Sequence, residues 1–133
     1  MPRLMSVALT EQAVIERRKT VTRRLGWTWL EPGTRLTLCR KVMGRRRADG
    51  TVEPLVRLAD VEVTDVRQEP LWMIAEDDIT AEGVPHSVWA AHDPDPKVHP
   101  TVKWAEWFAT QMRCSIDTPV TRIEWRYLDG PDD

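Results

Sequence analysis

Apolar and polar residues alternate along two stretches of the chain, as they do in a β-strand with one buried face. In residues 34–42 the alternation sets Leu36 and Leu38 against Thr37 and Cys39. In residues 52–66 the apolar positions form a longer run: Val56, Leu58, Ala59, Val61, Val63 and Val66. Short apolar or β-branched runs predict three more strands, over 4–9, over 19–24 and from residue 118.

Other stretches have the spacing of helices. Thr10 is placed to cap a short helix over 11–16, and the acids at 76–78 cap a helix that Gly83 ends. A further helical turn is expected over 87–91. The helix predicted over 101–112 carries apolar residues on one face, which we expect to dock on the sheet: Trp104, Trp107, Phe108 and Met112.

Turn-forming residues separate these elements. Glu31-Pro32-Gly33 predicts a turn, and Asp49-Gly50 predicts a hairpin tip whose exposed rim is Arg45-Arg46-Arg47. The proline-rich segment 92–100 is expected to be a loop, and 130–133 a frayed tail. The pattern as a whole predicts an α+β fold: a mixed β-barrel or half-barrel with short flanking helices, formed by one domain over residues 1–129.

Length and composition agree with one globular domain. The 133 residues suffice for a single hydrophobic core, and 41% hydrophobic with 30% charged residues is usual for a soluble protein. No apolar run approaches the roughly 20 residues of a membrane-spanning helix, and the first dozen residues lack the apolar core of a secretory signal. We therefore expect a cytoplasmic protein with no membrane partner, in which Cys39 and Cys114 are buried thiols.

The net charge of −2 conceals an uneven distribution. Residues 1–50 hold 12 Lys and Arg against 4 Asp and Glu, a net of +8, whereas residues 51–133 hold 7 against 17, a net of −10. The positive half either attracts phosphate groups or pairs with the acids of the other half. Arginine is the main cation, at 15 residues against 4 lysines, and its guanidinium group binds phosphate in a bidentate manner.

Tryptophan is unusually common, with seven residues against one Phe and one Tyr. Most of these indoles are expected in the core, since they are the largest apolar groups of a small domain. Trp27 and Trp29 differ because they follow a basic run, where an indole face could stack on a nucleic-acid base.

Several kinds of site have no motif in this sequence. It contains no Gly-rich phosphate loop, no Cys-x-x-Cys and no Gly-x-Ser-x-Gly, so Rossmann, zinc-ribbon and serine-hydrolase functions are not indicated and no cofactor is expected. His86, His92 and His99 lie near two aspartates, but their spacing matches no pattern of metal ligands. We expect no bound metal.

The segment from Arg17 to Arg24 has the richest chemistry. Lys19 is followed at one and three residues by the hydroxyls of Thr20 and Thr22, among arginines. A lysine there supplies a cation whose pKa can shift, and the hydroxyls are candidate nucleophiles or hydrogen-bond donors to phosphate. The alternative is an ordinary solvated basic strand, with Thr20, Thr22 and Arg24 on one face and Lys19, Val21 and Arg23 on the other.

This segment, from Glu16 to Leu25, resembles the signature of the ASCH domain family, whose fold is similar to that of the PUA domain. The signature is Gly-x-Lys followed after four residues by Arg; Lys19 and Arg24 match it, and Arg17 stands at the glycine position. The Pro-Gly turn, the strand up to Val66, the step Ala81-Glu82-Gly83-Val84 and the final strand recur in the same order. The resemblance covers nearly the whole chain and implies a PUA-like fold.

The resemblance implies a ligand in a cleft beside the motif, either RNA or a modified nucleoside or nucleotide. We favour an RNA- or nucleotide-binding protein in which cations contact phosphates and an indole stacks on a base. The candidate nucleic-acid-binding residues are Lys19, Thr20, Arg23, Arg24, Trp27, Trp29, Arg45, Arg46 and Arg47.

An enzymatic alternative also follows from the resemblance. Some small ASCH proteins remove the acetyl group from N4-acetylcytidine with a lysine, a threonine three residues later and a distant glutamate, which here would be Lys19, Thr22 and Glu82. The lysine would activate the hydroxyl, and the carboxyl group would deliver a proton to the leaving amine. Glu82 could equally be a solvated or capping acid at a helix end. A third alternative is an interaction protein whose basic half docks an acidic partner.

Overall fold

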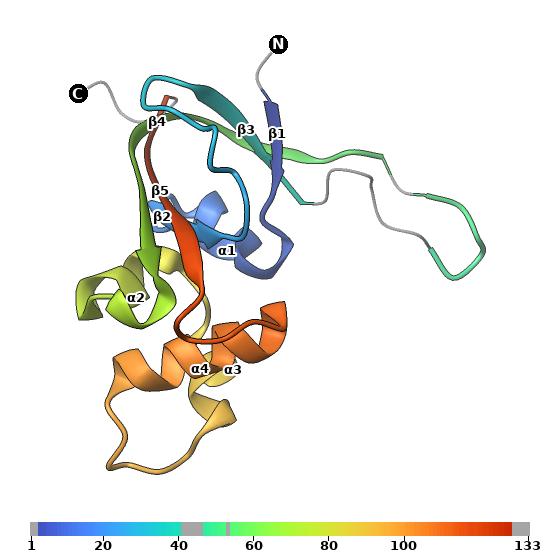
Figure 1. Ribbon diagram of the computed structural model, residues 1–133. Helices are drawn as coiled ribbons and strands as arrows, with labels where there is room; N and C mark the ends of the chain where they lie inside the picture. Colours follow the sequence, from blue (N-terminus) through green and yellow to red (C-terminus); the bar gives the residue numbers. More distant parts are fainter. Residues whose placement is uncertain (1–2, 41–46, 53, 129–133) are drawn as a thin grey trace.

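The computed structural model describes residues 3–40, 47–52 and 54–128. Five strands form one mixed sheet in the order β1-β3-β4-β5-β2 (Figure 1). Only β1 and β3 pair in parallel; the other neighbouring strands are antiparallel. The strands are β1 (Arg3–Ser6), β2 (Val21–Arg24), β3 (Arg35–Cys39), β4 (Arg57–Pro70) and β5 (Pro119–Tyr127).

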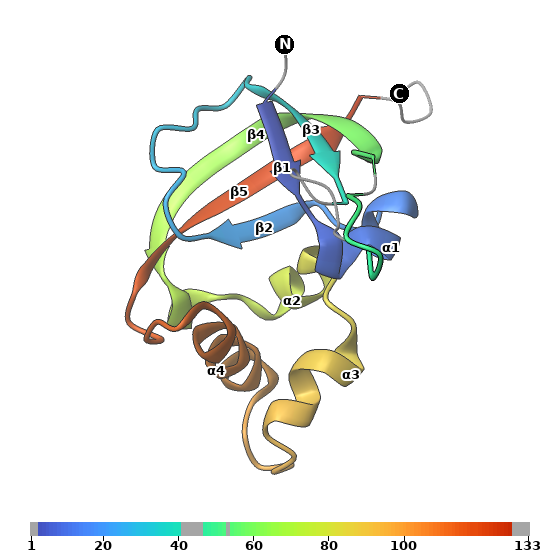
Figure 2. The same ribbon diagram turned by 90° about the vertical axis from the view of Figure 1, so that its right-hand side faces the viewer.

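The sheet curls into a half-barrel, and most of the helices gather beyond one end of it (Figure 2). The predicted α+β half-barrel with short flanking helices is therefore confirmed. The helical elements are η1 (Ala8–Thr10), α1 (Glu11–Ile15), η2 (Leu71–Met73), α2 (Glu76–Glu82), α3 (His86–Trp89), η3 (Ala90–His92) and α4 (Pro100–Met112). Among the described residues, no helix has the length and apolar character needed to cross a membrane.

The buried apolar residues form two clusters. One fills the half-barrel and includes Met5, Leu36, Val61 and Trp125. The other lies among the helices, around Trp104 and the neighbouring aromatic residues of α4. The alternation along β3 and β4 accounts for the first cluster, because residues two apart point to the same face of a strand.

The helix predicted over 101–112 forms as α4, but its packing differs from the prediction. It packs mainly against η2, α2, α3 and η3 rather than on the sheet, and Val120 at the start of β5 belongs to the same buried cluster. Met112 is 40% exposed instead of buried with the other apolar residues of its face. The apolar residues of α4 form one cluster with Leu71, Ile79 and Trp89 of the other helical elements, because these side chains lie next to its apolar face.

Two other predictions need adjustment. Strand β1 is shorter than the predicted 4–9, since η1 takes its last residues. Thr10 precedes α1 but does not cap it; its hydroxyl donates to the carbonyl of Val7 instead. The Asp49-Gly50 turn forms as predicted, with the Gly50 amide donating to the Arg47 carbonyl at 3.0 Å. Arg45, Arg46 and the predicted tail at 130–133 lie outside the described residues.

Candidate functional site

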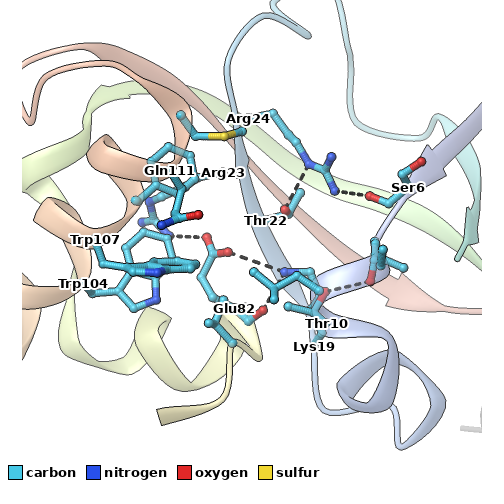
Figure 3. Close-up of a pocket in the computed structure, with 16 residues that line it drawn as sticks. Ser6, Thr10, Lys19, Thr22, Arg23, Arg24, Glu82, Trp104, Trp107 and Gln111 are labelled. Atoms are coloured by element: carbon cyan, nitrogen blue, oxygen red, sulfur yellow. Dashed lines mark hydrogen bonds and ion pairs between the residues drawn. The ribbon is translucent and has the colours of Figure 1, made fainter. Parts of the chain in front are cut away.

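A cavity of about 320 Å³ opens where the half-barrel meets the helices (Figure 3). Its walls come from segments far apart in the sequence. They comprise Ser6 to Thr10, Lys19, Thr22, Arg23 and Arg24, Glu82 and Val84, and Trp104, Trp107, Phe108, Gln111 and Met112. All three residues of the predicted catalytic set, Lys19, Thr22 and Glu82, therefore line one cavity. Its volume is at the lower end of the range typical of small-molecule sites.

The backbone around Lys19 is held on several sides. Arg17 adopts a positive φ of 61°, which turns the chain out of α1 towards β2. The Lys19 carbonyl accepts hydrogen bonds from the indole of Trp125 and the phenol of Tyr127, both on β5. Gly83 packs so closely on Lys19 that an added Cβ would lie 3.2 Å from the Lys19 Cβ. These contacts determine where the lysine side chain begins.

The Lys19 side chain is buried, and its Nζ points to Glu82. Nζ donates to the Glu82 carbonyl at 2.6 Å and lies 3.5 Å from Oε1 of the same residue. That carbonyl belongs to the last residue of α2, where helix carbonyls lack partners within the helix. Burial lowers the pKa of Lys19 to about 8, although the Glu82 carboxylate partly opposes this effect. A substantial fraction of the amine is therefore neutral just above neutral pH.

Thr22 and Arg24 occupy the wall opposite Glu82 (Figure 3). The Arg24 Nε donates to Thr22 Oγ1 at 3.3 Å, and Nη2 donates to the Ser6 carbonyl at 2.6 Å. Because β1 and β2 are the two edges of the sheet, Arg24 bridges the open side of the half-barrel. Burial lowers the pKa of Arg24. Through its hydrogen bond to Thr22, the guanidinium group places a positive charge next to the threonine hydroxyl.

Arg23 lies at the centre of a buried cluster of ions. Its Nη1 donates to Glu82 Oε2 at 3.0 Å, and Nη2 donates to Asp78 at 2.6 Å and to Glu69 at 3.1 Å. Arg122 on β5 also donates to Asp78, through Nε at 2.7 Å. Burial raises the pKa of Asp78, but the hydrogen bonds from Arg122 and Arg23 outweigh it and lower the pKa to about 2. The cluster orients Glu82 from the side opposite Lys19.

These ion pairs show how the two oppositely charged halves of the chain meet. Lys19 and Arg23 come from the basic half, and Glu69, Asp78 and Glu82 come from the acidic half. Pairing within the molecule, one of the two expected uses of the positive charge, therefore occurs at both cations. The Arg23 side chain has no exposed surface.

The other predicted nucleic-acid-binding residues that the structure describes do not line the cavity. Thr20 is partly buried and does not line it. Trp27 and Trp29 stack on each other with ring centroids 5.3 Å apart, and the Arg3 guanidinium lies 4.5 Å from the centre of the Trp29 ring. Trp29 is 54% exposed. Arg47 is exposed on the turn between β3 and β4.

Sequence reasoning missed several residues of the site. Trp104 and Trp107 were assigned to packing alone, yet both line the cavity as well as the helical core. No sequence pattern marked Glu69, Asp78 or Arg122 as part of a buried site, because charged residues on a strand or in the first turn of a helix are usually solvated. Among the described residues, no three His, Cys, Asp or Glu side chains gather as metal ligands. Cys39 is buried and Cys114 partly buried, both as free thiols.

Comparison with known proteins identifies the fold. No protein-family model matches the sequence, and no curated protein matches it significantly. The chain resembles several solved structures, among them the following two. A DUF984 protein from Enterococcus faecalis V583 superimposes with a TM-score of 0.58 at 15% identity, covering 96% of this chain and 77% of its own. An ASCH domain from Lactobacillus crispatus JV V101 gives a TM-score of 0.51 at 12% identity, covering 89% and 69%. At these identities the likeness is one of fold.

Proposed function

We propose that this chain, whose fold is that of an ASCH domain, hydrolyses the amide bond of a small N-acylated nucleobase such as that of N4-acetylcytidine. The observation that carries the proposal is the buried Lys19 amine, with a pKa of about 8, in one cavity with the Thr22 hydroxyl and the Glu82 carboxylate. A neutral amine in the same cavity as a hydroxyl is a candidate general base for that nucleophile.

The reaction would proceed through an ester on Thr22. Neutral Lys19 accepts the hydroxyl proton as Thr22 Oγ1 forms a bond to the acyl carbon of the substrate. The carbon–nitrogen bond then breaks, and the proton passes from the Lys19 ammonium group to the leaving amine nitrogen. Water hydrolyses the ester to release the carboxylic acid and restore the hydroxyl.

The surrounding residues support activation of Thr22 and binding of the base. The Arg24 Nε already donates to Thr22 Oγ1, so it stabilises negative charge as the proton leaves. Glu82 holds Lys19 Nζ through its carbonyl and carboxylate, and Arg23 fixes the carboxylate from the other side. Trp104, Trp107 and Phe108 supply the apolar walls that a planar base requires.

The size and charge of the site favour this function over binding of an RNA backbone. The cations at the cavity are engaged within the protein: Arg23 with three carboxylates, Lys19 with Glu82, and Arg24 with Thr22 and Ser6. A cation held in this way positions other groups more readily than it neutralises a phosphate. RNA binding by the exposed Arg47 and by the Trp27–Trp29 pair stays a prediction.

The test is to incubate the protein with N4-acetylcytidine and to follow its conversion to cytidine. We expect turnover that rises with pH through an apparent pKa of about 8, because the neutral amine is the active form. Lys19→Met and Thr22→Val should each lower kcat/KM by about a thousandfold, whereas Thr22→Ser should keep most of the rate because it keeps a hydroxyl.

A matched control is Lys103→Met, on α4 and outside the cavity, which should leave the rate unchanged. Each variant is first checked for folding by circular dichroism. Absence of turnover by the folded wild-type protein, together with saturable binding of the nucleoside, would reject hydrolysis of this substrate and favour a binding module.

A further inference from the structure

A second cavity, of about 390 Å³, adjoins the first. Leu9, Thr10 and Val84 line both cavities, so these three residues form their common wall. The remaining wall of the second cavity comes from α1 and the segment that follows it, and from α2, α3 and the stretch between them. Its residues are Gln12, Ala13, Arg18, Ile79, Thr80, Gly83, Pro85, His86 and Trp89. The two cavities are therefore direct neighbours.

The polar groups of the second cavity differ in charge from those of the first. Arg18, His86 and Thr80 line it, and no Asp or Glu does so among the residues that the structure describes. In the first cavity, by contrast, the Glu82 carboxylate pairs with Lys19 and Arg23. The second cavity therefore offers hydrogen-bond donors without a competing carboxylate in its walls.

Only one of the three guanidinium nitrogens of Arg18 donates a hydrogen bond within the described residues. Its Nε donates to Glu16 Oε1 at 2.5 Å, but Nη1 and Nη2 have no acceptor within the described ranges. The side chain is 55% exposed, so its guanidinium group can turn towards a ligand at little cost. The His86 ring lies nearly perpendicular to the Trp89 ring, with centroids 4.9 Å apart, and the residue is exposed.

We propose that the second cavity binds a phosphate group of the same ligand whose acylated base occupies the first cavity. Guanidinium, imidazole and hydroxyl groups can all donate hydrogen bonds to phosphate oxygens, and the guanidinium group can donate two at once. The substrate is then a nucleotide, either free or within an RNA strand, rather than a nucleoside. This inference rests on the proposed function in one respect, because it assumes that the nucleobase of the ligand lies beside Lys19.

The test measures binding, so it does not depend on turnover. Calorimetric titration of the full chain compares cytidine with cytidine 5′-monophosphate, at low and at high salt. We expect the phosphate to tighten binding about tenfold, and the gain to shrink as salt screens the charge. Arg18→Ala should remove the gain without changing the affinity for cytidine, and Arg18→Lys should restore part of it.

Arg35→Ala is the matched control, because Arg35 is also an exposed arginine but lies on β3 and lines neither cavity. Equal affinities for cytidine and its monophosphate would overturn the inference, as would equal losses from Arg18→Ala and Arg35→Ala. A cytidine trinucleotide identifies the source of the phosphate: binding tighter than that of the monophosphate indicates an RNA strand, and weaker binding indicates a free nucleotide.

The two proposals fail in different ways. Turnover of N4-acetylcytidine without any phosphate gain would reject the second cavity as a phosphate site and leave the hydrolase intact. A phosphate gain that depends on Arg18, in a protein that does not hydrolyse N4-acetylcytidine, would reject the hydrolase and keep the phosphate site.

Discussion

Arg17 occupies the position at which the ASCH signature has glycine, and its backbone adopts the conformation that glycine favours. Its φ of 61° lies in the left-handed region, where a side chain with a Cβ costs roughly 1–2 kcal/mol. Two contacts offset part of this cost: Nη1 donates to the Val14 carbonyl at 2.8 Å, and the guanidinium group lies 5.0 Å from the centre of the Tyr127 ring. The turn that leads to Lys19 is therefore kept without the glycine.

Two separate variants of Arg17, one with glycine and one with alanine, test this backbone conformation. Both Arg17→Gly and Arg17→Ala lose the side-chain contacts, but only alanine keeps the strain. We expect the glycine variant to be about 1 kcal/mol more stable than the alanine variant in urea unfolding. Equal stability, or a more stable alanine variant, would show that the residue does not hold a left-handed conformation in solution.

Lys19 depends on a second close approach, at Gly83. This glycine ends α2 with a φ of 76°, and an added Cβ would lie 2.7 Å from the Cβ of Ala13. The sequence predicted that Gly83 ends the helix, and the structure confirms it. Its second role, allowing α2 to approach α1 and Lys19, has no local signature, because it depends on which segments meet in space.

At the scale of elements, Asp78 joins α2 to the sheet. It accepts hydrogen bonds from Arg23 on β2 and from Arg122 on β5, both buried. The sequence assigned the acids at 76–78 to capping, a role that suits acids in the first turn of a helix. Asp78 turns inward instead, because buried arginines on two strands need a carboxylate partner.

Asp78→Asn should therefore loosen the attachment of α2 to the sheet. Removing one partner of a buried ion pair leaves the other charge uncompensated, and we expect a loss of roughly 3 kcal/mol in the free energy of unfolding at pH 7. Asp77→Asn, at the exposed neighbouring position, should leave stability nearly unchanged. Urea unfolding measures both variants.

The pH dependence of this loss follows from the lowered pKa of Asp78, about 2 against a usual 3.8. A carboxyl group with a lowered pKa stabilises the folded state above its unfolded pKa and loses that effect as pH falls towards the folded pKa. The difference between the wild type and Asp78→Asn should therefore be full above about pH 4 and shrink towards pH 2. A difference that is constant over this range would contradict the assignment.

At the scale of the whole molecule, the fold keeps a lysine buried between its two cores. The folded pKa of about 8 lies below the usual 10.5, so the unfolded chain binds more protons between these values. Stability rises with pH wherever the unfolded state binds more protons. The charged lysine thus destabilises the folded protein at pH 7, and this destabilisation disappears as pH rises above about 8 towards 10.5.

Comparison of the wild type with Lys19→Met measures this effect. Between pH 7 and pH 10.5, the stability of the wild type relative to the variant should increase by roughly 3 kcal/mol. Other titrating groups are common to both proteins and cancel in the difference. Lys103→Met should instead follow the wild type at every pH. Parallel curves for the wild type and Lys19→Met would show that Lys19 is not held with a lowered pKa.

Local patterns sufficed for most of the elements. Alternation in 34–42 and 52–66 predicted β3 and β4, and Gly33, Gly50 and Gly83 marked turns or ends that the structure retains. These predictions succeeded because side-chain periodicity and backbone conformation depend on neighbouring residues. The prediction that α4 docks on the sheet was wrong because periodicity identifies an apolar face but not the element that covers it.

The sequence by itself determined the half-barrel with its short helices. The resemblance to the ASCH family singled out Lys19 and Arg24 through its signature, and Thr22 and Glu82 through the catalytic residues of its small hydrolases. Only the tertiary structure brought Lys19 to Glu82, across 63 residues, and buried both against Arg23. It also decided that the positive charge of the first 50 residues is partly neutralised within the molecule, and that a second cavity adjoins the first. The physical reason is that burial, pKa and ion pairing depend on groups distant along the chain, which no local pattern records.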